Sequence, residues 1–153
     1  MAFLVDGNNL MHALIGVHGS PGRAGLVRLL ARLVELGQKV HVVFDGPPRD
    51  SEQIDSAGVQ VSYSGRRAAD ELLAELIAAD SGPRELVVVS SDREVRRAAR
   101  RRRCYTRTSE SFAKTLLAAS RRTGRSASDE PPEKTEGLSA EQTNKWLREF
   151  GIG

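Results

Sequence analysis

The sequence predicts an α/β domain in which a mainly parallel sheet carries helices on both faces. Three observations support this prediction. Short apolar runs alternate with helical periodicities over residues 1–122, the run at 86–89 is almost entirely valine, and the connections between elements are short. Repeated β-α-β units favour a parallel sheet, and a strand that is covered on both faces reads as a continuous apolar run. The chain of 153 residues is long enough to build one such core.

The individual elements follow from periodicity and from turn residues. Helices are expected where leucines recur at three- and four-residue steps, and strands where β-branched residues form short runs. Ser20 and Pro21 predict one helix start, and a capping box at Ser91–Glu94 predicts another, with Ser91 as its N-cap. His12 and His18 lack metal-ligand spacing and are expected in loops. Strands are expected at 2–5, 40–44, 59–63, 86–89 and 104–106, and helices at 21–36, 66–79, 91–103 and 109–121.

A change in composition divides the chain into three predicted segments. Residues 1–122 contain the alternating strands and helices and form the predicted folded domain. Residues 123–137 are polar, contain two prolines and lack periodicity, which is typical of a flexible linker. A second capping box at 139–142 predicts a helix within 138–153. Its apolar residues need a surface on this domain or on a partner; they are Trp146, Leu147 and Phe150.

Charge is unevenly distributed along the chain. Residues 1–128 carry 20 Lys and Arg against 14 Asp and Glu, whereas residues 129–153 carry 3 against 6. Arginine supplies most of the basic residues, and its planar guanidinium suits phosphate better than the point charge of lysine does. The basic part of the chain is therefore weak evidence for a nucleic-acid partner.

The sequence also indicates the compartment. The first residues, MAFLVDGNN, lack the basic region and the long apolar run of a signal peptide. No stretch approaches the roughly 20 apolar residues that cross a bilayer. Cys104 is the single cysteine, which excludes an internal disulfide and a cysteine-based zinc site. We expect a cytoplasmic protein without a membrane partner.

Four aspartates fall at or just after predicted strand ends or helix starts. Asp6 follows the first strand, Asp45 follows the second, and Asp92 comes shortly after the valine-rich strand. Asp70 opens the helix after the third strand. In a parallel sheet, ligands bind beyond the carboxyl ends of the strands, so we expect all four carboxylates on one rim. Each of them alone would be a turn or capping residue more often than a site residue.

Carboxylates that gather on one rim repel one another unless a cation lies between them. Hard divalent cations such as Mg²⁺ or Mn²⁺ are the natural occupants, and such an ion supports phosphodiester hydrolysis by activating water. Two asparagines and a serine next to the aspartates are predicted to orient water, touch phosphate or support the site; they are Asn8, Asn9 and Ser90. Turn and helix-start roles are the alternative for all three.

The motifs VDGNNL, VVFDG, AADELL and VVSSD, in this order and spacing, resemble the YacP-like nucleases of the NYN group within the PIN-like superfamily. The resemblance covers about residues 2–122 and includes the C-terminal helix with Trp146. It implies a Rossmann-like, PIN-type three-layer fold, dependence on Mg²⁺ or Mn²⁺, and endonucleolytic cleavage of RNA. The matching acidic positions are Asp6, Asp45, Asp70 and Asp92. In the leading hypothesis Asp6, Asp70 and Asp92 hold the ion and Asp45 supports it.

An arginine-rich segment follows Asp92. Eight arginines lie between Arg93 and Arg107. Arg93 and Arg97 share one helical face close to the rim, and Arg66 and Arg67 precede Asp70, so these four are predicted to bind the substrate backbone. A solvated basic face is the alternative. Whether cleavage requires a larger assembly such as the ribosome is left open by the sequence.

Three other functions are alternatives for this sequence. A non-catalytic RNA-binding module is the main alternative, and the complete acidic set argues against it. A haloacid-dehalogenase-type phosphatase needs a second aspartate two residues after the first, where this chain has Asn8. A dinucleotide-binding module needs a GxGxxG turn after the first strand, and that turn is absent from the sequence.

Overall fold

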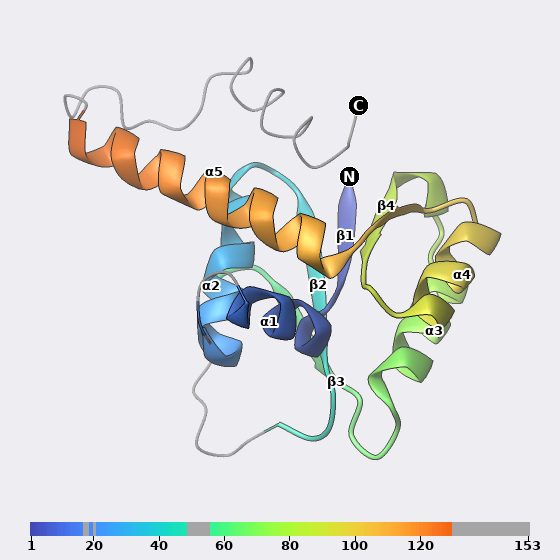
Figure 1. Ribbon diagram of the computed structural model, residues 1–153. Helices are drawn as coiled ribbons and strands as arrows, with labels where there is room; N and C mark the ends of the chain where they lie inside the picture. The colour runs from blue at the N-terminus through green and yellow to red at the C-terminus, as the bar shows by residue number, and fades with distance from the viewer. Residues whose placement is uncertain (17–18, 20, 49–55, 130–153) are drawn as a thin grey trace.

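The structure is a computed structural model that describes residues 1–16, 19, 21–48 and 56–129, with side chains up to residue 119. Strands and helices alternate along this part of the chain (Figure 1). The elements are, in order, β1 (Ala2–Asp6), α1 (Gly7–Ile15), α2 (Gly22–Glu35), β2 (Lys39–Phe44), β3 (Gln60–Tyr63), α3 (Ala69–Ala79), the 3-10 turn η1 (Pro83–Glu85), β4 (Leu86–Val89), α4 (Arg93–Arg101), β5 (Tyr105–Arg107) and α5 (Ser109–Asp129).

The five strands form one parallel sheet in the order β3-β2-β1-β4-β5. The register pairs Val5 with Val42 on one side and with Val89 on the other. Because all strands run in the same direction, their carboxyl ends lie along a single edge of the sheet. That edge is called the rim below, and the predicted α/β class with a parallel sheet is confirmed.

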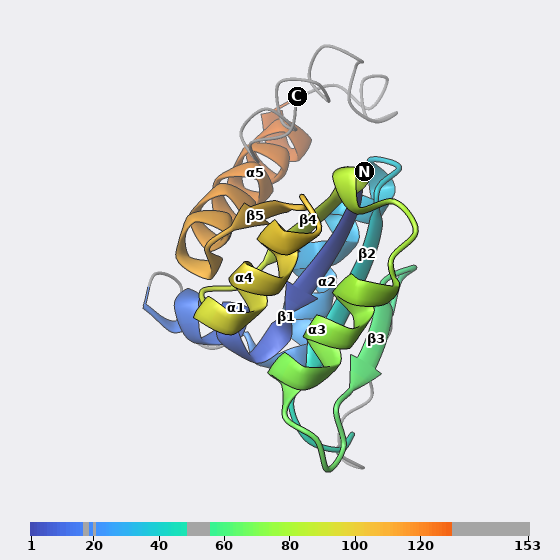
Figure 2. The same cartoon turned by 90° about the vertical axis from the view of Figure 1, so that its right-hand side faces the viewer.

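Helices cover both faces of the sheet in three layers (Figure 2). Phe3 and Val5 of β1 belong to a core cluster that also contains Leu10, Leu30 and Phe112, so this face packs against α1, α2 and α5. Leu4, between them in sequence, belongs to the opposite cluster with residues of α3 and α4. The alternation arises because successive side chains of a strand point to opposite faces, and it accounts for the fully apolar central strands.

Helix α1 was not predicted, and His12 lies on it rather than in a loop. The helix begins directly after β1, with Leu10 and Leu14 buried one turn apart. Gly7 permits this abrupt start, because a Cβ atom there would lie 2.6 Å from Cδ1 of Phe44 and 2.9 Å from the Val43 carbonyl oxygen. The helical spacing of Leu10 and Leu14 is a weak signal, because the segment is short and Asn8 and Asn9 are typical of a turn.

The predicted N-cap of α4 was wrong by one residue. Asp92, not Ser91, is the cap, and its Oδ1 accepts hydrogen bonds from the backbone N–H groups of Glu94 and Val95 at 2.8 and 3.2 Å. Aspartate and serine are about equally good caps, so local sequence does not separate them. Ser91 is instead engaged by α1 and α5, as described below.

Helix α5 continues to Asp129, past the predicted end near Arg121. Residues 123–129, expected as the first part of the linker, are therefore helical. The segment contains no proline before Pro131, so nothing in the backbone stops the helix earlier. The remaining linker residues, the predicted C-terminal helix at 138–153, Ser20 and His18 lie outside the described residues. Among the residues that are described, no helix has the length and apolar character needed to cross a membrane.

Candidate functional site

The rim brings together three of the predicted aspartates. Asp6 is the last residue of β1, at the centre of the sheet, and only 7% of it is exposed. Asp45 follows β2, and Asp92 follows β4 by three residues. These two strands flank β1, so Asp6 lies between the other two acidic positions.

The environment of Asp6 disfavours its charged form. Burial raises the pKa of this carboxyl, and the negative charges of Asp92 and Asp45 raise it further. Hydrogen bonds from the Asn9 N–H to Oδ1 at 3.3 Å and from the Ser90 hydroxyl to Oδ2 at 3.1 Å act in the opposite direction. A buried carboxylate next to two others is a costly arrangement in a protein, and such perturbed groups cluster at functional sites.

Ser90 connects Asp6 to Asp92. The residue is fully buried; its hydroxyl donates to Asp6 and accepts a hydrogen bond from the Asp92 N–H at 3.0 Å. Its own N–H donates to the Arg107 carbonyl of β5 at 3.0 Å. One side chain therefore fixes the spacing between the ends of β1 and β4. A supporting role of Ser90 in the site remains a prediction.

Asn8 and Asn9 hold neighbouring loops. The Asn8 Oδ1 accepts a hydrogen bond from the Asp45 N–H at 2.8 Å, which ties the start of α1 to the end of β2. The Asn9 Oδ1 accepts hydrogen bonds from the Ser91 N–H at 2.9 Å and from the Ser109 hydroxyl at 2.5 Å. Asn9 thus acts as a structural bridge, whereas Asn8 is exposed at the rim.

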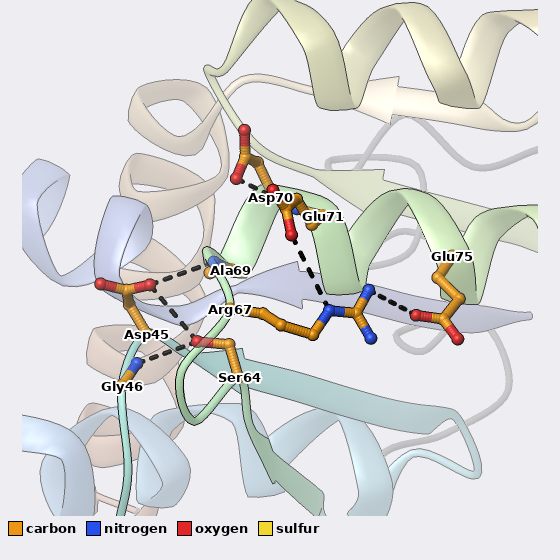
Figure 3. A network of polar contacts seen from close by, with 8 residues as sticks. All are labelled: Asp45, Gly46, Ser64, Arg67, Ala69, Asp70, Glu71 and Glu75. Atoms are coloured by element: carbon orange, nitrogen blue, oxygen red, sulfur yellow. Dashed lines mark hydrogen bonds and ion pairs between the residues drawn. The ribbon is translucent and has the colours of Figure 1, made fainter.

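The Asp45 side chain is tied to the start of α3 (Figure 3). Its Oδ1 accepts hydrogen bonds from the Ala69 N–H at 3.0 Å and from the Ser64 hydroxyl at 3.3 Å. The residue at the N-cap position of α3, Ala68, has no side chain that can cap the helix. Asp45 therefore supplies the capping carboxylate from a different strand.

A buried arginine holds the backbone at Asp45. Arg23 of α2 donates from Nη2 to the Asp45 carbonyl oxygen at 2.9 Å, and its guanidinium lies 5.1 Å from the ring centroid of Phe44 and 5.6 Å from that of Tyr63. Only 6% of Arg23 is exposed. This role is not predictable from the sequence, because an arginine within an amphipathic helix is usually part of its solvated face.

Asp70 lies in the first turn of α3, which follows the carboxyl end of β3. It is half-buried, and its Oδ1 accepts a hydrogen bond from the Glu71 N–H at 3.0 Å. Arg67 lies on the other side of this turn, where its guanidinium forms ion pairs with Glu71 and Glu75 at 3.8 and 2.5 Å. Asp70 points away from Arg67 (Figure 3), so the structure directs Arg67 along α3 rather than toward Asp70. Arg66 is exposed.

Two of the predicted basic residues lie at the start of α4. Arg93 and Arg97 are both exposed, in the first turn of the helix and one turn further on. They are placed next to Asp92, which begins the helix at the rim. This placement leaves both guanidinium groups accessible to a ligand that occupies the rim.

Glu110 is a further acidic residue at the rim, and it is not among the residues predicted from the sequence. It accepts a hydrogen bond from the Ser91 hydroxyl, which also accepts one from the Ser109 N–H at 3.0 Å. The Ser91 hydrogen bond lowers the pKa of Glu110, and the charges of Arg96 and His12 contribute in the same direction. The rule that located the other acids could have found it, since α5 begins just beyond the carboxyl end of β5.

The donor set at the rim can be compared with the requirements of a hard cation. Within residues 1–16, 21–48 and 56–119, no three His, Cys, Asp or Glu side chains lie close enough together to surround one ion. Mg²⁺ usually takes one or two carboxylates and keeps several waters, so the carboxylates of the rim fit it in kind. Asp6 retains acceptor capacity beyond its two hydrogen bonds, because an ionised carboxylate offers about four lone-pair sites.

The fold and the rim together define a three-layer α/β protein with an acidic site at the carboxyl ends of a parallel sheet, the arrangement of the PIN-like nucleases. The chain belongs to the YacP-like NYN domain family, whose model matches residues 3–150. The NYN domain family is a group of nucleases that generally use divalent metal ions, which supports a nuclease role for this chain.

Solved structures agree with this assignment. The chain is similar to Rae1 (YacP) from Bacillus subtilis, with a TM-score of 0.69, 22% identity, and coverage of 99% of this chain and 92% of that one. The W164L mutant of the same protein matches with a TM-score of 0.65, 22% identity and coverage of 98% and 96%. At this identity the likeness shows the fold. No curated protein sequence matches the chain.

Proposed function

We propose that the chain is a metal-dependent RNA endonuclease that hydrolyses phosphodiester bonds at the acidic rim. The observation that carries the proposal is the environment of Asp6, a buried carboxylate whose pKa is raised by burial and by the charges of two further aspartates. Repulsion between neighbouring carboxylates costs stability, and a cation that neutralises them would remove this cost. Membership of a nuclease family supports the same reading.

In this proposal Asp6, Asp70 and Asp92 are the metal ligands, directly or through water. A bound Mg²⁺ or Mn²⁺ supplies an activated water and stabilises charge on the phosphoryl and leaving oxygens. Asp45 positions the start of α3, which carries Asp70, through its hydrogen bond to the Ala69 N–H. Ser90 holds Asp6 and Asp92 at a constant separation through its buried hydroxyl.

The positive charge beside the rim favours a substrate with a phosphate backbone. Arg93 and Arg97 are exposed beside the rim and can neutralise phosphates of a bound strand, and Asn8 and Arg66 are further exposed polar groups at the same edge. RNA is the substrate that the family assignment favours. The ribosome is a partner to be included in the assays, since the sequence leaves open whether cleavage needs a larger assembly.

The deciding experiment compares the wild-type protein with Asp6→Asn and Asp70→Asn on single-stranded and structured RNA, with Mn²⁺, with Mg²⁺ and with a chelating agent. The proposal expects internal cleavage that requires metal and is lost in both variants. Glu35→Gln, on the exposed end of α2 and away from the rim, is the matched control and should cleave normally. RNA binding by the wild type without cleavage, in every metal and with ribosomes added, would instead support a binding module.

Metal binding can be tested without activity. Because a ligand that binds only the native state stabilises it, Mn²⁺ should raise the thermal midpoint of the wild-type protein and should do so much less for Asp6→Asn. An equal increase in both proteins would contradict the assignment of Asp6 as a ligand.

A further inference from the structure

Helix α4 carries its arginines to the end of the sheet opposite the rim. It begins after Asp92 at the rim and ends at Arg101, about 13 Å away along its axis. The chain then turns, and β5 starts at Tyr105, which pairs with Val87 near the beginning of β4. The last turn of α4 and the first residue of β5 therefore lie at the amino ends of the strands (Figure 2).

Four residues at this end form a surface that we call the distal basic patch: Arg100, Arg101, Arg103 and Tyr105. All four are exposed. Tyr105 is 51% exposed, and in the described part of the chain Ile15 is the other large hydrophobic residue that is exposed. Within the same described part, none of the three arginines forms an ion pair or a side-chain hydrogen bond. Their positive charges are therefore available to a ligand.

Arg102, in the middle of the same run, has a different role. Its Nη1 donates hydrogen bonds to the carbonyl oxygens of Ile77, Ala78 and Asp80, at 2.8, 2.8 and 2.7 Å. These are carbonyl groups at the end of α3, which lack partners within that helix. The Arg102 side chain thus stabilises the fold, whereas the side chains of Arg100, Arg101 and Arg103 form no hydrogen bond or ion pair among the described residues.

Arg103 occupies a position that usually belongs to glycine. It has a φ of 62°, and the backbone bonds from Cys104 N–H to Ala99 O at 2.9 Å and from Arg103 N–H to Arg100 O at 3.0 Å form a Schellman motif. An arginine in this left-handed conformation is strained where glycine would be relaxed. The Arg103 side chain thus occupies a position that costs stability, and it forms no hydrogen bond or ion pair with the residues that the structure describes.

We propose that the distal basic patch binds a second segment of the RNA strand, away from the point of cleavage. This inference rests on the proposed function. Arginine guanidinium groups pair with phosphates, and an exposed tyrosine provides a surface on which an unpaired base stacks. Arg103 and Tyr105 are two residues apart along the chain, with Cα atoms within about 7 Å of each other. The Tyr105 side chain lies on the α5 face of the edge strand β5, because its partner Val87 belongs to the core cluster of that face. A strand that contacts both groups therefore crosses this edge of the sheet. Single-stranded RNA matches this combination, because its bases are free to stack.

The test measures binding of a fluorescently labelled single-stranded RNA in the presence of a chelating agent, so that cleavage does not interfere. The variant Arg100→Gln/Arg101→Gln/Arg103→Gly should bind more weakly, and the slope of log K against log salt should become shallower by about 2, as expected for three lost phosphate contacts on a single strand. Tyr105→Ala should weaken binding by about fivefold or more.

A matched control removes the same charge elsewhere. Arg28→Gln/Arg32→Gln/Lys39→Gln changes α2 and the start of β2, and it should leave the salt slope closer to that of the wild type. Equal loss in both triple variants would show that net charge alone matters and would overturn the patch. Unchanged binding in the first triple variant would overturn it as well.

The single variant Arg103→Gly separates function from folding. It relaxes the backbone at the end of α4, so the thermal midpoint should rise while RNA affinity falls. Because this variant is expected to be more stable than the wild type, a loss of affinity cannot be attributed to a folding defect. An affinity equal to that of the wild type would contradict the proposal. If the wild type prefers vesicles with anionic lipid over RNA at the same salt concentration, the patch is a membrane contact instead.

Failure of the proposed function is distinguishable from failure of this inference. If no RNA is cleaved under any condition while the patch variants still lose affinity, the rim assignment fails and the patch stands. If cleavage occurs, the patch predicts that the variants raise KM for long RNA and leave kcat unchanged, with little effect on RNA too short to reach both sites. A loss of kcat with KM unchanged would contradict it.

Discussion

The Asp45 carboxylate accepts a hydrogen bond at 3.0 Å from the backbone N–H of Ala69, the first residue of the helix that carries Asp70. One proposed site residue thereby positions another, across 24 residues of sequence. An aspartate that caps a helix from a different strand couples the end of β2 to the orientation of α3. Asp45 is consequently better described as a positioning residue than as a metal ligand.

Substitution of Asp45 tests this coupling. Asp45→Ala removes the cap and should lower the free energy of unfolding by about 1 kcal/mol. It should also reduce kcat, because the first turn of α3 loses its anchor. Asp45→Asn keeps an acceptor for the Ala69 N–H and should restore most of both quantities. If the asparagine variant is as inactive as Asp6→Asn, the charge of Asp45 is required and the positioning role is insufficient.

Asp6 should limit stability at neutral pH. Its folded-state pKa is raised above the ordinary value of an aspartate. Its contribution to stability is therefore present below that ordinary value and is lost as pH rises through the folded pKa. Asp6→Asn should therefore have a higher thermal midpoint than the wild type at pH 7, in metal-free buffer. The same variant should lose cleavage on the order of 100-fold or more, since a catalytic metal supplies several kcal/mol.

The pH dependence of the difference in thermal midpoint between Asp6→Asn and the wild type tests this prediction. Thermal denaturation between pH 3 and pH 8 should show the two proteins converging as the carboxyl of the wild type becomes protonated. An asparagine variant that is less stable than the wild type at every pH would contradict the predicted cost of the buried charge.

Ser90→Ala should act on both the fold and the pH profile. Its hydroxyl is buried and serves Asp6 and Asp92, so the loss should cost about 1–3 kcal/mol of stability. The hydrogen bond from Ser90 lowers the pKa of Asp6, so its removal should shift the acid limb of the kcat/KM profile to higher pH. Ser64→Ala removes a hydroxyl that serves Asp45 instead and should leave that limb in place.

Gly7→Ala should destabilise the protein through crowding. The added methyl group would lie 2.6 Å from the Phe44 ring and 2.9 Å from a backbone oxygen, and overpacking of this kind costs about 1–3 kcal/mol. Gly16→Ala, at the other end of α1, would meet its nearest heavy atom at 3.7 Å and should be close to neutral. Urea denaturation of the two variants measures the difference; equal midpoints would show that β1 and α1 adjust to the methyl group.

The sequence was sufficient for the class of fold, and the site that it predicts remains a prediction. The valine-rich run of β4 and the leucine spacing of α2 and α3 predict a parallel sheet covered on both faces, and the topology rule places the residues after each strand at one rim. The motif order also identified the family correctly. Less was predictable where the local signal was short or ambiguous, as for α1, for the cap of α4 and for the end of α5.

What the sequence determined by itself is where polar residues interrupt apolar runs, and this was enough to single out Asp6, Asp45, Asp70 and Asp92. Tertiary structure decided what each of them contacts. Strand order places Asp6 between Asp45 and Asp92, and the packing of α3 and α5 against the sheet brings Ala69 to Asp45 and Ser109 to Asn9. These partners are distant in sequence, and no local propensity specifies them, because they depend on which elements pack side by side.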